Sequence, residues 1–193
     1  MRLVLATRNA HKVRELGELL PGHTIVPLGG DVVLPPETGS TFAENALGKA
    51  RAAAAATEEP AIADDSGICV AALGGAPGVR SARWAGEDAT DADNLQLLLT
   101  SVPDGGDLEY VCVIAFVDAA GDREEIFEGR CAGVMTTEPR GTGGFGYDPA
   151  FVPVDDSSGR TMAELSSVEK DAISHRGRAF RALVARLPEL LGS

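Results

Sequence analysis

The sequence of 193 residues is poor in aromatic and in basic side chains. Aromatic residues make up 5%, and 17 lysines and arginines stand against 29 aspartates and glutamates, so the formal net charge is −12. This excess of negative charge excludes broad, non-specific binding to nucleic acid or to an anionic membrane surface. It still permits a small anionic ligand, provided that positive charge is gathered locally or that a metal ion intervenes.

Cysteine is also scarce. Cys69, Cys112 and Cys131 are odd in number and form no C-x-x-C pair, so the sequence predicts neither a disulfide framework nor a zinc site. Isolated thiols among apolar or small neighbours indicate buried cysteines in a reducing compartment. The N-terminal apolar run, residues 3–6, is too short for a signal peptide, and no run approaches the length of a membrane span. We therefore expect a cytoplasmic protein.

The remaining composition is that of an ordinary globular domain, with 44% hydrophobic and 24% charged residues. The sequence has no repeats, linkers or low-complexity tails, which predicts a single domain over residues 1–193. Hydrophobic periodicity predicts the main elements. The expected strands cover residues 2–6, 24–28, 108–118 and 123–134, and the expected helices begin near residues 13, 41, 90 and 174.

The most unusual stretch is residues 62–70, where two adjacent carboxylates separate two apolar segments. Carboxylates are rarely buried unless they are paired or bind a metal. One interpretation is a tight turn, because Asp64, Asp65, Ser66 and Gly67 are all turn-forming residues. The other is a metal or general-base site at the end of a strand. Neighbouring strand residues point to opposite faces, so only one of the two aspartates then faces a given ligand.

Two further polar segments precede this stretch. Residues 7–12 lead from the first strand into a helix, and the free N–H groups and dipole of a helix start favour an anion. The alternative is that Thr7 or Asn9 only caps the helix and that Lys12 is a surface lysine. Glu37 follows two prolines, which make a rigid loop and aim its carboxylate, although a solvated loop residue is the simpler interpretation.

The helix after this loop opens with a capping box formed by Thr41 and Glu44, which gives Glu44 a structural duty. Lys49, on the same helix, either reaches a ligand near the helix start or faces water. Residues 141–149 are rich in glycine, which lets backbone approach a ligand closely, and carry aromatic rings suited to stacking. The alternative is a glycine hairpin with an aromatic ring packed in the core.

The last helix is expected to begin after Ser174, with His175 and Arg176 in its first turn. Cations at this position oppose the helix dipole. Their presence indicates an anionic or carbonyl-bearing partner. Asp148, in the glycine-rich segment, can accept hydrogen bonds from ring N–H groups of a base.

Six segments, in order along nearly the whole chain, together resemble the inosine/xanthosine triphosphate pyrophosphatase family, which hydrolyses aberrant purine nucleoside triphosphates. The segments are LATRNAHK (residues 5–12), ETGSTFAENA (37–46), ADDSG (63–67), LGGAPG (73–78), GGFGYDP (143–149) and SHRG (174–177).

The resemblance implies an α/β fold with a mixed central sheet flanked by helices, and two lobes around a central nucleotide-binding groove. It also implies a homodimer and a requirement for Mg²⁺. Metal ligands would be Glu37 and Asp65, and Asp65 would accept a proton in catalysis. The triphosphate would bind to Thr7, Arg8, Asn9, Ala10, His11 and Lys12, with help from Lys49. The rest of the substrate would contact Ser66, Phe145, Gly146, Tyr147, Asp148, Lys170, His175 and Arg176.

The implied reaction converts ITP, dITP or XTP to the nucleoside monophosphate and pyrophosphate, and so removes these nucleotides before they enter DNA or RNA. The alternatives are a nucleotide sensor without turnover and a pyrophosphatase for other modified nucleotides. Arg8 stands where many members of the family carry a smaller residue, and it either adds a phosphate contact or blocks one. Nucleic acid and membranes are not expected partners.

Overall fold

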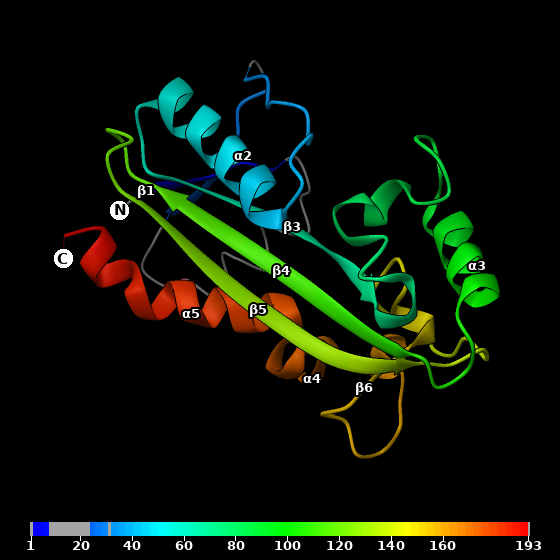
Figure 1. Cartoon of the computed structure of the whole chain (residues 1–193). Helices are drawn as coiled ribbons and strands as arrows, with labels where there is room; N and C mark the ends of the chain where they lie inside the picture. The colour runs from blue at the N-terminus through cyan, green and yellow to red at the C-terminus, as the bar shows by residue number, and fades with distance from the viewer. Residues whose placement is uncertain (1, 8–23, 31, 193) are drawn as a thin grey trace. The chain divides into compact units, whose positions relative to one another are not determined.

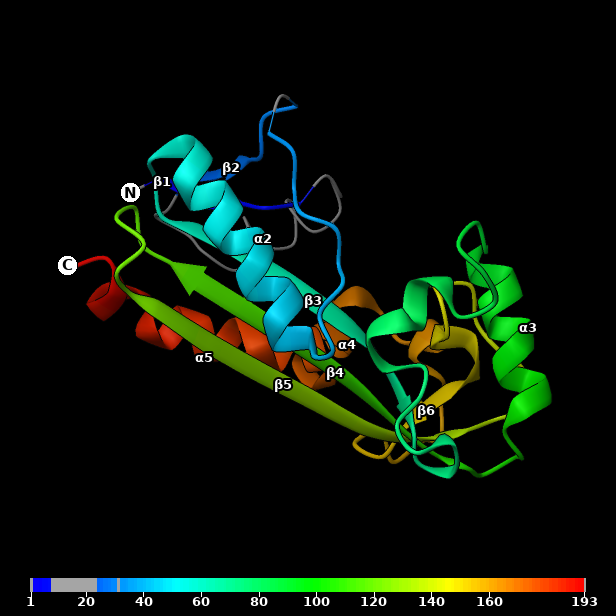
Figure 2. The same cartoon turned by 45° about the horizontal axis from the view of Figure 1, so that its top comes forward.

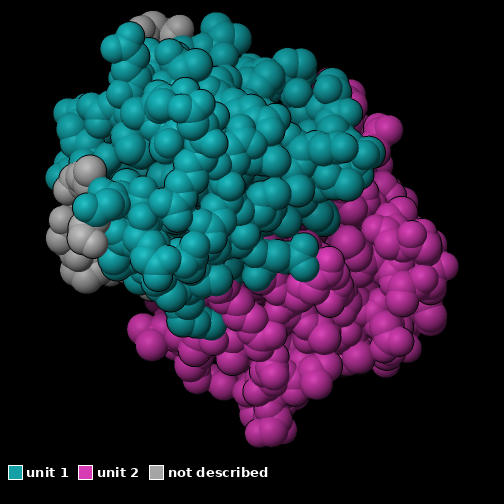
Figure 3. Space-filling model, turned by 60° about the vertical axis from the view of Figure 1, so that its left-hand side comes forward, with its two compact units in different colours: residues 1–65, 113–128, 179–193 teal, residues 66–112, 129–178 magenta. Residues whose placement is uncertain are grey.

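The computed structural model describes residues 2–7, 24–30 and 32–192. The chain forms two compact units, which Figure 3 shows in different colours. Unit 1 comprises residues 1–65, 113–128 and 179–193, and unit 2 comprises residues 66–112 and 129–178.

The described residues contain one six-stranded sheet with the order β2-β1-β3-β4-β5-β6 (Figure 1). Strand β1 pairs in parallel with β2 and β3, whereas β5 and β6 pair antiparallel, so the sheet is mixed as expected. Val4 lies opposite Ala61 in the β1–β3 register, and Met135 lies opposite Phe151 in the β5–β6 register. The strands are β1 Arg2–Leu5, β2 Thr24–Pro27, β3 Ala61–Val70, β4 Asp107–Val117, β5 Glu124–Met135 and β6 Phe151–Pro153.

Helices flank the sheet, and most begin at caps that are visible in the sequence. Thr41 accepts a hydrogen bond from Glu44 N at 3.1 Å, and the Glu44 carboxylate accepts one from Thr41 N at 3.2 Å, so the predicted capping box is confirmed. In unit 1, α2 and the later turns of α5 cover opposite faces of the sheet (Figures 1 and 2). The helices are α2 Phe42–Thr57, α3 Asp91–Ser101, α4 Ser167–Ile173 and α5 His175–Leu190.

Strand β3 corrects the interpretation of residues 62–70. The chain neither turns nor ends a strand there, because β3 continues for ten residues through Asp64 and Asp65. Both aspartates are buried, with 4% and 8% of their surfaces exposed. The turn-forming residues stay extended because neighbouring strands and side chains from α2 satisfy their polar groups. Lys49 donates to the backbone oxygen of Asp64, and Asn45 donates to the Asp65 carboxylate.

Strands β4 and β5 follow the sequence closely. Strand β4 is buried along nearly its whole length, lies between β3 and β5, and is therefore central as predicted. Asp118 N donates to Arg123 O at 3.0 Å in the turn that joins the two strands. Cys112 and Cys131 are buried and Cys69 is half-buried, and all three are free thiols.

The predicted last helix is present, with Phe180, Leu183 and Leu187 buried along one face. Helix α4 was not predicted, although Ser166 and Glu169 form a capping box at its start. The helix expected near residue 13 lies outside the described residues. Within the described part of the chain, no helix combines the length and the apolar character that crossing a membrane would need.

Candidate active site

In unit 1, Lys49 joins the loop that precedes α2 to strand β3. Its Nζ lies 2.5 Å from Glu37 Oε1 and donates to Asp64 O at 2.7 Å. Only 9% of Lys49 is exposed, so the interpretation in which Lys49 faces water is wrong. A buried ammonium needs such partners, because an isolated charge is costly to remove from water.

Asn45, one turn earlier on α2, contacts the second aspartate. Its Nδ2 donates to Asp65 Oδ2 at 2.9 Å, and its Oδ1 accepts from Gly39 N at 2.8 Å. Because a backbone N–H can only donate, the amide orientation is fixed by Gly39. Asn45 therefore ties the Glu37 loop to Asp65, a role that the sequence analysis missed. Its position beside Glu44 in the helix start gave no signal of this long-range contact.

A cavity of about 360 Å³ in unit 1 brings some of these groups together. Thr7 is one of its lining residues, whereas Arg8, Asn9, Ala10, His11 and Lys12, predicted to bind the triphosphate, lie outside the described residues. The cavity is lined by Ala6, Thr7, Val33, Leu34, Glu37, Lys49 and Asp64.

The carboxylates of unit 1 are oxygen donors of the kind that Mg²⁺ prefers. No group of three His, Cys, Asp or Glu side chains in the described residues is arranged to hold a metal ion. Mg²⁺ is commonly bound by one or two carboxylates together with water and substrate phosphates. Glu37 and Asp65 both offer such oxygens, with Lys49 and Asn45 as their neighbours, but the cavity is lined by Glu37 and Asp64 and not by Asp65.

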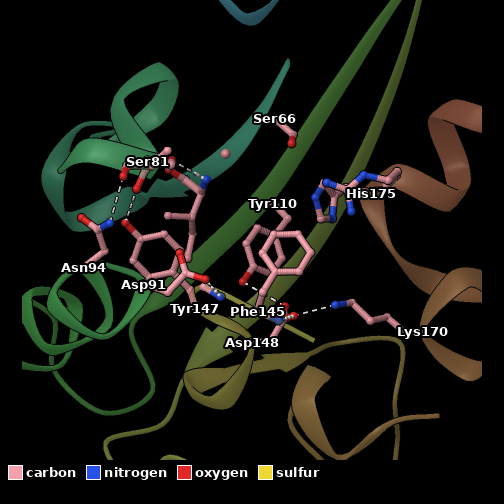
Figure 4. A pocket seen from close by; sticks show the side chains of 15 residues that line it. Ser66, Ser81, Asp91, Asn94, Tyr110, Phe145, Tyr147, Asp148, Lys170 and His175 are labelled. Atoms are coloured by element: carbon pink, nitrogen blue, oxygen red, sulfur yellow. Dashed lines mark hydrogen bonds and ion pairs between the residues drawn. The ribbon is translucent and has the colours of Figure 1, made fainter. Parts of the chain in front are cut away.

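In unit 2, a separate pocket of about 120 Å³ gathers the predicted base-binding residues from β3, the glycine-rich segment, α4 and α5 (Figure 4). Every predicted site residue of this unit lines it, namely Ser66, Phe145, Gly146, Tyr147, Asp148, Lys170, His175 and Arg176.

Asp148 is the polar centre of this pocket, with 3% of its surface exposed. Its Oδ2 lies 2.5 Å from Lys170 Nζ and accepts from Phe145 N at 2.9 Å. Its Oδ1 accepts from the Tyr110 hydroxyl at 3.2 Å. Figure 4 shows the carboxylate between the tyrosine and the lysine. Three donors from the protein already bind the Asp148 carboxylate, so this side chain holds the residues of the pocket wall in position.

The two aromatic rings of the glycine-rich segment differ in exposure. Phe145 is 56% exposed, and Lys170 and Arg176 lie 5.3 and 5.5 Å from its ring centre. Tyr147 is buried and donates to Ser81 O at 2.7 Å, and burial raises the pKa of its hydroxyl well above the usual range. Tyr147 is thus the core-packed ring of the alternative interpretation, although the segment forms turns and a short 3-10 helix and not a hairpin, whereas more than half of Phe145 is exposed.

His175 begins α5 and lines the pocket with only 8% of its surface exposed. Its ring stacks on Tyr110, with centroids 4.7 Å apart and planes inclined by 19°. Ser174 fixes this segment, since its N–H donates to Lys170 O at 2.8 Å and its hydroxyl accepts from Gly177 N at 3.1 Å. It thus closes α4 and opens α5, as its predicted capping role required.

The sequence analysis missed several residues that line the same pocket. Asp91 accepts from Gly146 N at 3.1 Å, and Asn94 donates to Ala82 O at 3.1 Å. Tyr110 was assigned only to a strand. Polar residues inside an apolar strand or at a helix start were the available signal, but they do not reveal which distant groups they contact.

The chain belongs to the Ham1 family, whose model matches residues 3–186. Among its relatives, a dITP/XTP pyrophosphatase of Streptomyces coelicolor is 50% identical over 201 residues, covering 99% of each chain. The dITP/XTP pyrophosphatase of Escherichia coli K12 is 52% identical over 197 residues, covering 96% of this chain and 98% of the relative.

Solved structures agree with this assignment. A HAM1 protein from Coxiella burnetii superposes with a TM-score of 0.89 at 44% identity, over 98% of this chain and 99% of that one. The Staphylococcus aureus Ham1 protein gives a TM-score of 0.88 at 37% identity, with the same coverage of both chains. The predicted family and its mixed α/β fold are confirmed. The roles of the individual site residues stay predictions.

Proposed function

We propose that the protein hydrolyses non-standard purine nucleoside triphosphates, ITP, dITP and XTP, to the nucleoside monophosphate and pyrophosphate. The observation that carries this proposal is the unit 2 pocket, where the exposed ring of Phe145 lies beside the cations Lys170 and Arg176. Relatives about half identical to this chain are named dITP/XTP pyrophosphatases, which supports the same activity here.

Base selectivity follows from the donors of this pocket. A purine stacks on Phe145, and Lys170, His175 and Arg176 donate toward its 6-oxygen. Adenine carries an amino group at that position, which would leave these donors without an acceptor. Unpaired buried donors are costly, so the mismatch disfavours ATP.

The triphosphate tail carries about four negative charges, which an acidic protein accepts only through clustered cations and a metal ion. We assign its binding to residues 7–12 and to Lys49. The ammonium of Lys49 lies beside Glu37 and Asp64 O, so it would place positive charge next to the carboxylates.

Glu37 and Asp65 would hold Mg²⁺. When bound, the ion neutralises phosphate charge and favours the departure of pyrophosphate. Asp65 accepts the proton of the attacking water, and Asn45 holds one carboxylate oxygen so that the side chain keeps one orientation. The water oxygen forms a bond to the α-phosphorus as the bridging bond to the β-phosphate breaks. The leaving pyrophosphate is stabilised by Lys12 and Lys49.

The family resemblance also implies a homodimer in the cytoplasm, and both features are part of the proposal. Light scattering on the eluting peak of a size-exclusion column tests the first, with twice the chain mass as the expected result. Fractionation of the source cells tests the second, with the protein expected in the cytosolic fraction.

A substrate panel tests the activity. The purified protein is incubated with ITP, dITP, XTP, GTP and ATP, with a pyrimidine triphosphate, and with and without Mg²⁺, and pyrophosphate and phosphate are measured separately. Pyrophosphate released from ITP, dITP and XTP far faster than from ATP supports the proposal. Binding without release would indicate a sensor. Release mainly from pyrimidine or bulky nucleotides would indicate a pyrophosphatase for other modified nucleotides.

A further inference from the structure

Tyr110 lies on β4 at the back of the unit 2 pocket, in an almost fully buried position with 6% of its surface exposed. Its ring stacks on Phe151, with centroids 4.3 Å apart and planes inclined by 24°. It also stacks on His175 at 4.7 Å and 19°. Two rings at such distances cannot share one face, so Tyr110 is held between a core aromatic and the first residue of α5. This contact restricts the plane of the His175 ring.

The hydroxyl of Tyr110 holds a second group of pocket residues in place. It donates to Asp148 Oδ1 at 3.2 Å, and Asp148 Oδ2 binds Lys170 and the backbone N–H of Phe145. One tyrosine therefore contacts His175 through its ring and, through Asp148, fixes Lys170 and Phe145 (Figure 4).

The hydroxyl is a donor at any physiological pH. Burial, and then the negative charge of Asp148, raises the pKa of Tyr110 well above its usual value of 10.0. Because the hydroxyl stays protonated and a carboxylate can only accept, the hydrogen bond always runs from Tyr110 to Asp148.

We propose that Tyr110 is a positioning residue for purine discrimination, which sets the donors of Lys170 and His175 at the geometry that a 6-oxopurine requires. The proposal rests on the hydrolysis of non-standard purine nucleotides given above. It adds a residue of the central strand that acts on the base through its neighbours. A displacement of about 1 Å of these donor atoms is enough to weaken discrimination, because hydrogen bonds weaken steeply with distance and angle.

The decisive variant is Tyr110→Phe, which removes the hydroxyl and keeps both ring contacts. We expect the ratio of kcat/KM for ITP to kcat/KM for ATP to fall by about tenfold, the usual effect of losing one hydrogen bond to a charged group. The change should appear mainly as a higher KM for ITP, because the contact acts on binding of the base. Affinity for inosine monophosphate, measured by calorimetry, should fall in parallel, whereas affinity for adenosine monophosphate should not.

The matched control is Cys131→Ala, in the same buried cluster as Tyr110 but without a hydrogen bond to Asp148. It should lower thermal stability while leaving the ITP to ATP ratio at the wild-type value. If Tyr110→Phe lowers both rates equally, or leaves the ratio unchanged, the positioning role is wrong and the tyrosine is only structural. If the wild-type protein releases pyrophosphate from none of the panel, the proposed function fails, and the positioning role fails with it.

Discussion

The side chain of Asn45 on α2 donates to Asp65 on β3 at 2.9 Å, inside the protein and 20 residues away along the chain. The other end of the same amide accepts from Gly39 N at 2.8 Å. A methyl group at Gly39 would lie 2.7 Å from the Asn45 oxygen, so the close approach of this loop depends on glycine. The loop that carries Glu37 and the carboxylate of Asp65 are thus fastened to one helix residue.

This contact predicts the behaviour of Asn45→Asp. The variant keeps an oxygen for Gly39 N but replaces the donor toward Asp65 with a second carboxylate oxygen. Repulsion between the two should lower the free energy of unfolding by about 1–3 kcal/mol and lower kcat by about tenfold or more. Urea denaturation and steady-state kinetics measure the two effects. Asn45→Ala loses both contacts without adding charge, and it should keep more activity than Asn45→Asp. The reverse order would contradict this account.

Asp65→Asn tests the proton acceptor itself. The amide keeps the shape of the carboxylate but does not take up a proton from water, so kcat should fall by about a thousandfold. Circular dichroism should show an intact fold.

Asp64→Asn is the natural comparison, because neighbouring strand residues point to opposite faces. Its loss of turnover should be at least about tenfold smaller, because the proposal assigns proton transfer and metal binding to Asp65 and neither role to Asp64. Near-full activity of Asp65→Asn would remove this residue as base and as metal ligand.

Gly144→Ala should damage the base pocket selectively. A Cβ at this position would lie 2.0 Å from Asp148 Oδ2 and 2.8 Å from Lys170 Nζ, on backbone with a φ of +73°. We expect the KM for ITP to rise by about tenfold, because the ion pair must move.

Gly159→Ala is the matched control for this substitution. Its φ of +70° carries the same backbone cost, about 1–2 kcal/mol, but nothing lies within 4 Å of the added carbon. Thermal melts should show similar destabilisation of both variants, and only Gly144→Ala should change KM. An equal KM in the two variants would show that the clash is relieved without loss of function.

We predict that the contribution of Glu169 to the free energy of unfolding is lost in acid. Hydrogen bonds from Ser166, and then from Arg160, lower its pKa from the usual 4.5 to about 2. The folded state thus holds the ionised form more strongly than the unfolded chain does. The stabilisation is complete above pH 4.5 and is lost as the pH falls toward 2.

Glu169→Gln should therefore flatten the decline of unfolding free energy between pH 4.5 and pH 2, measured by denaturant titration at a series of pH values. It leaves the pocket side chain of Lys170 in place. Identical slopes for the variant and the wild type would refute the contribution of Glu169.

Local signals in the sequence predicted a large part of this structure. The capping box of Thr41 and Glu44 predicted the start of α2, and the apolar run of residues 110–117 predicted a central strand. Both signals are local, because caps and periodicity depend on neighbours in the chain. The residues that were predicted for the base pocket all line one cavity, and their role in binding a base stays a prediction.

The contacts that organise the site were not accessible in this way. Asp148 and Tyr110 are 38 residues apart, and Lys170 is 22 residues from Asp148. Periodicity assigns each residue to an element and a face, but it says nothing about which distant polar group will satisfy it. The interpretation of residues 62–70 as a turn or strand end failed for the same reason. Asp64 and Asp65 remain in a strand because partners on α2, far away in sequence, compensate for their burial.

The single residue Ser174 is the whole joint between α4 and α5. Lys170 and His175 therefore stand at a separation set by helix geometry on each side, with no slack loop to absorb a change. We expect substitutions around Ser174 to be tolerated, whereas an inserted or deleted residue there would rotate Lys170 away from His175. Length variation should instead accumulate at the β4–β5 turn, where residues 118–123 carry none of the pocket.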